Sequence, residues 1–232
     1  KPILIRAIGP TLQAFGVGGA LADPLLVLRD AGGRTVLEND NWGGVAAVAS
    51  AAGRLGAFAL DAGSRDAAVL PSIAPASYTA TVSPATAAIS PGEVLVELYD
   101  ADSASATRLT NVSSRAQLGS GGVLVAGFAV GGTGRRNVLI RAVGPTLAAF
   151  GVSGAMADPR MEINRDGAVI RTSDNWNPNL APLFPVVGAF PLAADSRDAA
   201  LALALDPGTY TAQISGVGSA GGVVLVEVYE LP

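Results

Sequence analysis

Two short polar clusters are the residues of this sequence best suited to hold a metal ion. They are Asp40-Asn41-Trp42 and Asp174-Asn175-Trp176. Carboxylate and amide oxygens, together with backbone carbonyls, are ligands that Ca²⁺ prefers, so the candidate Ca²⁺ ligands are Asp40, Asn41, Asp174 and Asn175. The competing interpretation is structural and is favoured: the Asx side chains bond their own backbone in a turn, and each tryptophan packs in a core. The spacing does not match an EF-hand loop.

A second pair of motifs contains a serine beside acidic residues, as in Ser64-Arg65-Asp66 and Ser196-Arg197-Asp198. A serine nucleophile needs a base, but the sequence contains no histidine and its only lysine is Lys1. Nothing in the sequence places two carboxylates in a cleft, as a glycosidase requires. We therefore expect each motif to be a turn held by an arginine–carboxylate pair before a strand. We predict no catalytic residues and no enzymatic activity.

These motifs belong to a long internal repeat. The stretch from Leu4 to Pro24 returns as Leu139 to Pro159 and differs from it at four of 21 positions. Downstream, Tyr78-Thr79-Ala80 returns as Tyr210-Thr211-Ala212, and Leu95-Val96-Glu97 as Leu225-Val226-Glu227. The offset falls from 135 to 130 along the chain, so the length differences lie between the motifs. A unit of this size is a domain rather than a solenoid coil, and the chain contains two copies of it.

Strand and turn signals recur about every 8–12 residues, which indicates antiparallel sandwiches rather than βαβ units. We predict an all-β protein of two tandem antiparallel, jelly-roll-like β-sandwich domains with short peripheral helical turns. Residues 1–102 form the first repeat, 103–108 a linker, and 109–232 the second repeat. The residues from Val45 to Leu55 are predicted to form a short helix. Their counterpart, Pro178 to Pro185, carries three prolines and is predicted to be irregular and peripheral.

Two arginines, Arg6 and Arg141, interrupt apolar strands. An outward, solvent-exposed position on an alternating strand is the favoured interpretation, because an inward arginine needs a carboxylate partner. Glu97 and Glu227 in the closing strands raise the same question, and an Arg–Glu cross-strand pair in each copy would answer it.

The two copies differ at their leading edges. The second copy has the stretch from Leu109 to Arg136, with two predicted strands, ahead of its LIRA motif, whereas the first begins at Lys1. The first copy is therefore predicted to lack about two strands, which would expose hydrogen-bonding edges and apolar core. Either the preceding residues are missing from this chain, or a neighbouring subunit supplies the strands.

Composition limits the partners. The net charge of −4 and the absence of a basic run argue against nucleic-acid binding. Half of the residues are hydrophobic and only 15% are charged, yet no apolar run approaches the ~20 residues of a membrane span. The apolar residues are therefore expected in cores and in contacts between subunits. The sequence has no cysteine, so disulfides and thiolate sites are excluded.

The motifs resemble a family of tandem β-sandwich repeats in large secreted proteins of environmental bacteria. The matching segments, in chain order, are Leu139–Pro145, Ala157–Pro159, Asp174–Trp176, Pro207–Ala212 and Val226–Glu230. The stretch from the Ala-Asp-Pro motif to the Tyr-Thr strand is also loosely similar to bacterial pre-peptidase C-terminal domains. Both resemblances imply export to the extracellular space or cell surface, a β-sandwich fold, and a binding or structural role without catalysis.

The favoured hypothesis is a non-enzymatic extracellular structural protein that assembles with itself into a filament or surface layer. The first domain, completed head to tail by strands of a neighbour, would join the subunits. The alternative is a carbohydrate-binding or Ca²⁺-dependent adhesive module of a larger secreted protein. No cofactor is predicted, apart from Ca²⁺ at the clusters named above.

Overall fold

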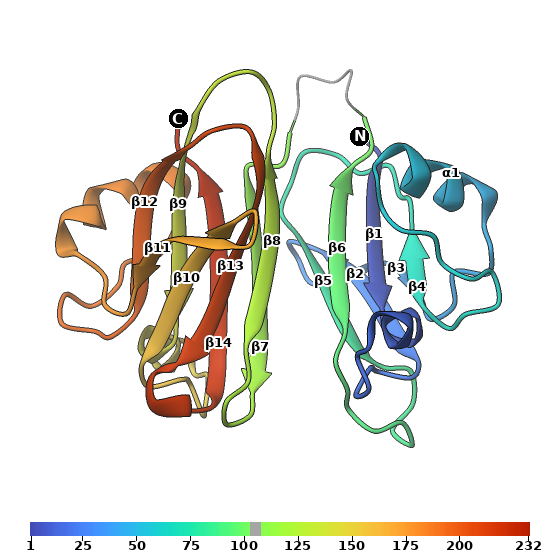
Figure 1. Ribbon diagram of the computed structural model, residues 1–232, viewed down its shortest axis with the longest axis horizontal. Coiled ribbons are helices and arrows are strands. Elements are labelled where there is room, and N and C mark those ends of the chain that lie inside the picture. The colour runs from blue at the N-terminus through green and yellow to red at the C-terminus, as the bar shows by residue number, and fades with distance from the viewer. Residues whose placement is uncertain (103–107) are drawn as a thin grey trace. The chain divides into compact units, whose positions relative to one another are not determined.

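The computed structural model describes residues 1–102 and 108–232, and the chain divides into two compact units (Figure 1). Unit 1 is Lys1–Leu109 and unit 2 is Thr110–Pro232. Of the predicted linker 103–108, residues 103–107 lie outside the described part of the chain. Each unit is a sandwich of two antiparallel sheets, so the all-β tandem-sandwich prediction is confirmed.

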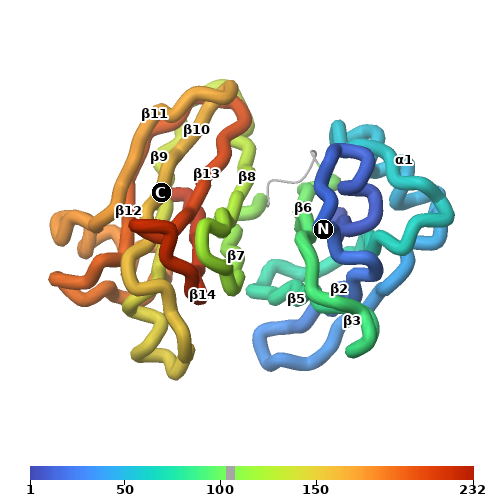
Figure 2. Tube along the Cα trace, turned by 60° about the horizontal axis from the view of Figure 1, so that its bottom comes forward, coloured from blue at the N-terminus to red at the C-terminus, as the bar shows by residue number. Residues whose placement is uncertain are grey.

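Unit 2 has four strands in each sheet, and neighbouring strands are antiparallel throughout. In spatial order, the first sheet is β12 (Ala199–Leu205), β9 (Arg136–Val143), β14 (Gly222–Glu230) and β7 (Asn111–Leu118). The second sheet is β11 (Ala168–Ser173), β10 (Pro159–Arg165), β13 (Gly208–Gly216) and β8 (Leu124–Val130) (Figure 2).

Unit 1 repeats this arrangement with three described strands in each sheet. Its first sheet is β4 (Ala67–Val69), β1 (Ile3–Ile8) and β6 (Leu95–Asp100). Its second sheet is β3 (Thr35–Asn39), β2 (Pro24–Asp30) and β5 (Tyr78–Pro84). Comparison with unit 2 shows that the counterparts of β7 and β8 are the two that the described part of unit 1 lacks.

Strand β1 is buried on both faces, which explains its unbroken apolar run. Ile3, Ile5 and Ala7 face the core between the two sheets. Leu4 lies on the opposite face, where it packs with Trp42 beneath helix α1 (Ala46–Arg54). The sandwich therefore carries a third layer over one sheet, and this layer covers positions that strand alternation alone would assign to solvent.

In unit 2 the corresponding layer consists of two 3₁₀ turns, η3 (Pro178–Leu183) and η4 (Pro185–Val187). The prediction of an irregular, peripheral segment is partly confirmed, since no α-helix forms and most of its residues are exposed, but one side chain is buried. A proline is tolerated at the first position of a helical turn, and both turns begin with one. Phe184 between them is only 2% exposed and packs on Trp176, so the segment forms part of a core.

The turn that follows β1 has the same form as the turn that follows its counterpart β9. The 3₁₀ helices η1 (Pro10–Phe15) and η2 (Pro145–Phe150) each end at a glycine in the left-handed conformation. Only a glycine fits before the proline that begins η1, because a Cβ on Gly9 would lie 1.9 Å from the Leu21 carbonyl oxygen. A short turn, η5 (Val217–Ser219), precedes β14.

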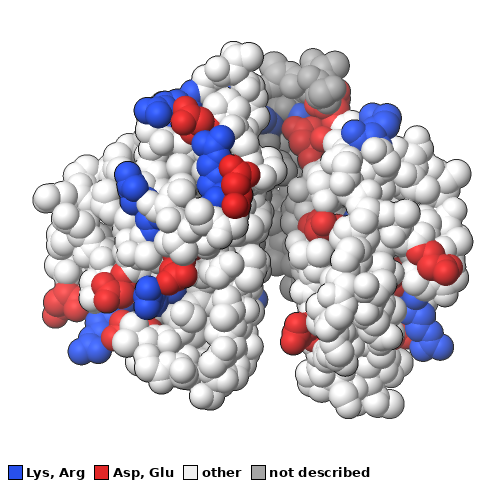
Figure 3. Space-filling model, viewed as in Figure 1, with Lys and Arg blue, Asp and Glu red and all other residues white. Residues whose placement is uncertain are grey.

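The molecular surface carries few charges, and the face drawn in Figure 3 shows them scattered among uncharged side chains. Within residues 1–102 and 108–232, no helix combines the length and the apolar character needed to cross a membrane.

Candidate functional site

The Asp-Asn-Trp clusters lie in turns that follow the hairpins β2–β3 and β10–β11. Asp40 and Asn41 are exposed, and so are Asp174 and Asn175. The tryptophans point inward with 5% and 6% exposure, and each indole N–H donates to a backbone carbonyl, 2.8 Å to Asp61 and 3.0 Å to Ala193. The core role expected for both tryptophans is thus confirmed.

The candidate Ca²⁺ ligands are not gathered into a cage. Asn175 Nδ2 donates to Asp174 Oδ1 at 3.4 Å, and the Asn41 carbonyl oxygen accepts from Asn39 Nδ2 at 2.9 Å. Among the described residues no group of three or more acidic, histidine or cysteine side chains converges on one point. Each cluster offers one carboxylate and one amide on an exposed turn, so Ca²⁺ binding there stays a prediction.

Asp66 of the first Ser-Arg-Asp motif is fully buried and caps the turn after β1. Its Oδ1 accepts from the backbone N–H of Gly9 at 2.8 Å and of Thr11 at 3.3 Å, and its Oδ2 accepts from the Thr11 hydroxyl. Unit 2 repeats the arrangement, with Asp198 accepting from Gly144 and Thr146. Since donors occupy both oxygens, the carboxylate holds the backbone rather than a substrate.

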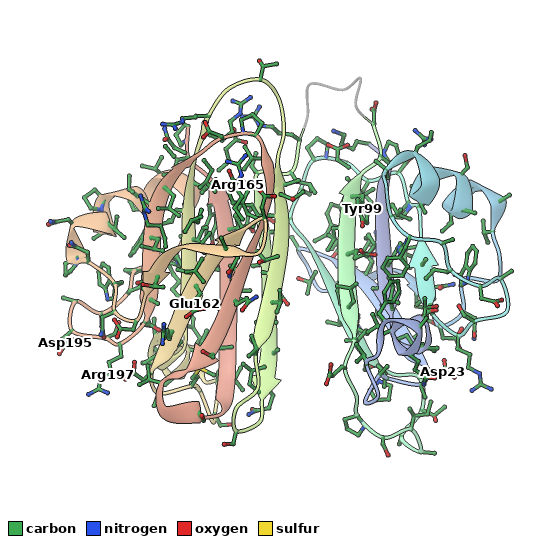
Figure 4. All side chains as sticks on the ribbon, viewed as in Figure 1. Asp23, Tyr99, Glu162, Arg165, Asp195 and Arg197 are labelled. Carbon is green, nitrogen blue, oxygen red and sulfur yellow. The ribbon has the colours of Figure 1, made fainter. Side chains whose placement is uncertain are left out.

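The arginine of the same motif forms an ion pair, as predicted. Arg65 Nη1 lies 3.1 Å from Asp23 Oδ2, and Arg197 Nη1 lies 2.8 Å from Asp158 Oδ2. Asp23 and Arg197 are labelled in Figure 4. The Ala-Asp-Pro and Ser-Arg-Asp motifs, which are distant in sequence, therefore recur together because they bind each other.

Arg6 and Arg141 are completely buried, so the favoured prediction of exposed arginines was wrong. Both side chains do point away from the space between the sheets, but the third layer covers that face. The predicted Arg–Glu cross-strand pairs are confirmed, because Arg6 lies opposite Glu97 on β6 and Arg141 lies opposite Glu227 on β14.

A phenylalanine and a tyrosine complete each buried cluster. The guanidinium of Arg6 lies 4.6 Å from the ring centre of Phe58 and donates to the Phe58 carbonyl at 2.7 Å. Arg141 makes the same two contacts with Phe190, at 4.4 Å and 2.6 Å. Sequence reasoning missed both phenylalanines, although a Gly-Ala-Phe triplet recurs at residues 56–58 and 188–190 and could have revealed them.

The tyrosine of each cluster donates to the glutamate. Tyr99 Oη is 2.8 Å from Glu97 Oε1, and Tyr229 Oη is 2.6 Å from Glu227 Oε1. Burial, and then the hydrogen bond to the carboxylate, raises the pKa of Tyr99 to about 12, and the pKa of Tyr229 is raised for the same reasons. Each phenol therefore stays a hydrogen-bond donor throughout the neutral range.

The clusters differ in how completely the arginine is paired. Arg141 donates twice to Glu227 Oε2, at 2.8 Å from Nε and 2.5 Å from Nη2. Arg6 Nε lies 2.9 Å from Glu97 Oε2 without hydrogen-bond alignment, and Arg6 Nη2 has no partner within the described part of the chain. Alanines of α1 stand where Phe184 packs in unit 2, and a cavity of about 110 Å³ lies beside Arg6.

The largest difference between the units is at one sheet edge. In unit 2, β7 pairs with β14 and β8 with β13, and residues 119–123 connect β7 to β8 across the sandwich. We call this element (Asn111–Val130) the arch. In unit 1 no described strand pairs with the outer side of β6 or β5, the counterparts of β14 and β13. We call these two outer sides together the open edge.

Side-chain exposure measures what the arch covers. Val226 on β14 faces the core with 1% exposure, whereas its counterpart Val96 on β6 is 38% exposed. Leu98 on β6 is also 38% exposed. On β13 the Tyr210 ring is 3% exposed and stacks on Phe128 of the arch at 5.6 Å between ring centres, whereas its counterpart Tyr78 is half-buried. The open edge thus combines unpaired backbone with partly exposed core residues.

Comparison with known proteins adds little to this description. No protein-family model and no curated protein matches the sequence. The solved structure of the pre-peptidase C-terminal domain of a collagenase from Bacillus anthracis is similar to this chain, with a TM-score of 0.33 and 11% identity. The similarity covers 51% of this chain and 89% of that one. The description of the fold rests on the sheets of the two units themselves.

Proposed function

We propose that the protein is a non-enzymatic structural component of an extracellular assembly, and that unit 1 joins neighbours by accepting strands at its open edge. The observation that carries this proposal is the 38% exposure of Val96 and Leu98 on an edge strand of a sandwich core. An unpaired strand with exposed apolar residues is a template for pairing with another chain.

The chemistry of the other candidate residues supports a structural role. Asp66 and Asp198 cap turns, and the buried arginines hold glutamates and backbone carbonyls. The resemblance of the repeated motifs to tandem sandwich repeats of large secreted bacterial proteins supports an extracellular location. A surface with few charges also favours close packing of subunits over mutual repulsion.

Sedimentation velocity and negative-stain electron microscopy of the whole chain test the proposal. The wild-type chain is expected to associate as its concentration rises. The variant Val96→Lys/Leu98→Lys, which places two charges on the open edge, is expected to stay unassociated. The matched control Val186→Lys/Val217→Lys changes two exposed valines of unit 2, which are not part of the open edge.

Equal association of wild type and the edge variant, or none in either, would overturn the proposal. A chelator arm separates the alternative of a Ca²⁺-dependent adhesive module. We expect association to persist in chelator, because the open edge contains no candidate Ca²⁺ ligand. Association that disappears with chelator and returns with Ca²⁺ would favour the Asp-Asn-Trp clusters instead.

A further inference from the structure

The cavity beside Arg6 lies where the second repeat places an aromatic side chain. In unit 2 the backbone N–H of Ala189 donates to the Phe184 carbonyl at 2.9 Å. In unit 1 the N–H of Ala57 donates to the Ala52 carbonyl at 3.0 Å. The two donors occupy the same position in the recurring Gly-Ala-Phe triplet. Ala52, which lines the cavity, is therefore the counterpart of Phe184.

Unit 2 shows what fits in this place. The ring of Phe184 lies 5.5 Å from the ring of Trp176 between centres, and the Arg141 guanidinium lies 4.9 Å from the phenylalanine ring centre. A guanidinium at this distance is attracted by the electrons of the ring face. Unit 1 offers the same two partners, because Arg6 and Trp42 both line the cavity. A ring bound there would make the contacts that Phe184 makes in unit 2.

The cavity has the size and the lining of a site for one small ring. Its volume is about 110 Å³, and an apolar cavity of about 150 Å³ can hold benzene. Apart from Arg6 and Trp42, every lining residue is aliphatic or glycine. Ala49, Gly53 and Ala59 in the lining are exposed, so a ligand can reach the cavity from solvent between α1 and the segment that follows it.

The charges beside the cavity select an uncharged ring. Arg6 repels a cation. Glu97 Oε2 already lies 2.9 Å from Arg6 Nε, so the pair has no net charge left to offset the hydration that an entering anion would lose. A neutral ring has no such cost, and it gains both the burial of its apolar surface and the attraction of the guanidinium.

We propose that the cavity of unit 1 binds a small, uncharged aromatic molecule of one ring, which takes the place that Phe184 fills in unit 2. The site lies in the third layer of unit 1, so it does not depend on how the chain associates. Under this proposal the two repeats carry an open and a filled version of one site, with Ala52 as the residue that leaves it open.

Fluorine NMR with fluorobenzene tests the proposal, because the protein has no fluorine signal of its own. The wild-type whole chain is expected to show one saturable site. Ala52→Phe places a ring in the cavity as unit 2 does, so it should abolish this binding. Phe184→Ala opens the same space beside Arg141 and should double the amount bound at saturation. In the variant Ala52→Phe/Phe184→Ala the single site should move to unit 2.

Two controls separate the effects of ring electrons and of folding from the effect of size. Fluorocyclohexane has nearly the size of fluorobenzene without the ring electrons, so it should bind several-fold more weakly. Near-ultraviolet circular dichroism shows whether Ala52→Phe keeps its packed core. If that variant does not fold, Ala52→Leu fills the cavity with a smaller side chain and should also weaken binding several-fold.

Three results would overturn the proposal. The first is wild-type chain that shows no saturable binding, including the case in which Phe184→Ala alone binds, because α1 would then close over the space in unit 1. The second is equal binding by the wild type and a folded Ala52→Phe or Ala52→Leu variant, which would place fluorobenzene elsewhere. The third is equal affinity for fluorobenzene and fluorocyclohexane, which would show that the cavity does not select an aromatic ring.

Discussion

Unit 1 and unit 2 place the same buried Arg–Glu pair on the same two central strands, yet they surround it differently. In unit 2 the arch extends both sheets, and Phe184 packs over the arginine. In unit 1 the sheets end at β6 and β5, and the helix α1 leaves a cavity of about 110 Å³ beside Arg6. Glu97 is 16% exposed, whereas Glu227 is 7% exposed.

The comparison divides the features of the repeat into two groups: those that both units share, and the open edge, which is found in unit 1 alone. Three features recur in both units: the Asp66 and Asp198 caps, the buried tryptophans and the Arg–Asp ion pairs. We therefore expect them to stabilise the fold of each sandwich. The open edge is found in the described part of unit 1 and not in unit 2. Under the proposed function, the edge serves association and the shared motifs serve stability.

The largest expected effect comes from breaking the buried ion pair in each unit. Arg141→Ala should lower the free energy of unfolding of unit 2 by about 3–5 kcal/mol, because Glu227 is left buried and unpaired. Arg6→Ala should cost unit 1 less, about 1–3 kcal/mol, because Glu97 is nearer to water and Arg6 makes fewer bonds. Urea unfolding followed by the single tryptophan of each unit measures both. Equal losses would show that the two clusters are equivalent.

A smaller effect is expected from the caps. Asp198→Ala and Asp66→Ala each leave buried backbone N–H groups without an acceptor, which costs about 1–3 kcal/mol. Asp198 accepts one further hydrogen bond, from the Ser196 hydroxyl at 2.7 Å, so its replacement should cost somewhat more than that of Asp66. Asparagine at either position keeps one acceptor oxygen and should recover part of the loss. A cap needed in only one unit would contradict the assignment of these motifs to the shared fold.

The smallest effect concerns alkaline pH. The pKa of Tyr99 is raised to about 12, above the value near 10 of an unfolded chain. Its contribution to stability is therefore complete below pH 10 and is lost as the pH rises from about 10 to 12. Tyr99→Phe should reduce this loss in unit 1 alone, as measured by urea midpoints at pH 9 and 11 through Trp42. An unchanged pH dependence would show that the phenol does not titrate in this interval.

Much of the fold follows from sequence because the signals are local or duplicated. The antiparallel β-sandwich of each copy and the Arg–Glu cross-strand pairs were predicted correctly. The burial of Arg6 and Arg141 was not, because a strand pattern shows which face a side chain takes but not what covers that face. The covering layer comes from residues about 50 positions away in each repeat.

The same limit applies to the candidate site. The proline-rich segment from Pro178 looks peripheral by propensity, yet Phe184 makes it part of the core through contacts that only the tertiary structure reveals. The open edge, in contrast, could be inferred from the missing strands alone. Val96 and Leu98 became identifiable as its exposed residues only when their counterparts on β14 were seen beneath the arch.

Hydrogen–deuterium exchange of the whole chain, with and without a synthetic peptide that spans the arch (residues 111–130), tests the account most directly. Without peptide, outward amides of β6 and β5 should exchange faster than their counterparts on β14 and β13, which are paired with the arch. The peptide should slow exchange on β6 and β5 and leave β14 and β13 unchanged. Strands β6 and β5 that are already as protected as β14 and β13, or that do not respond to the peptide, would contradict an open edge built to receive an arch.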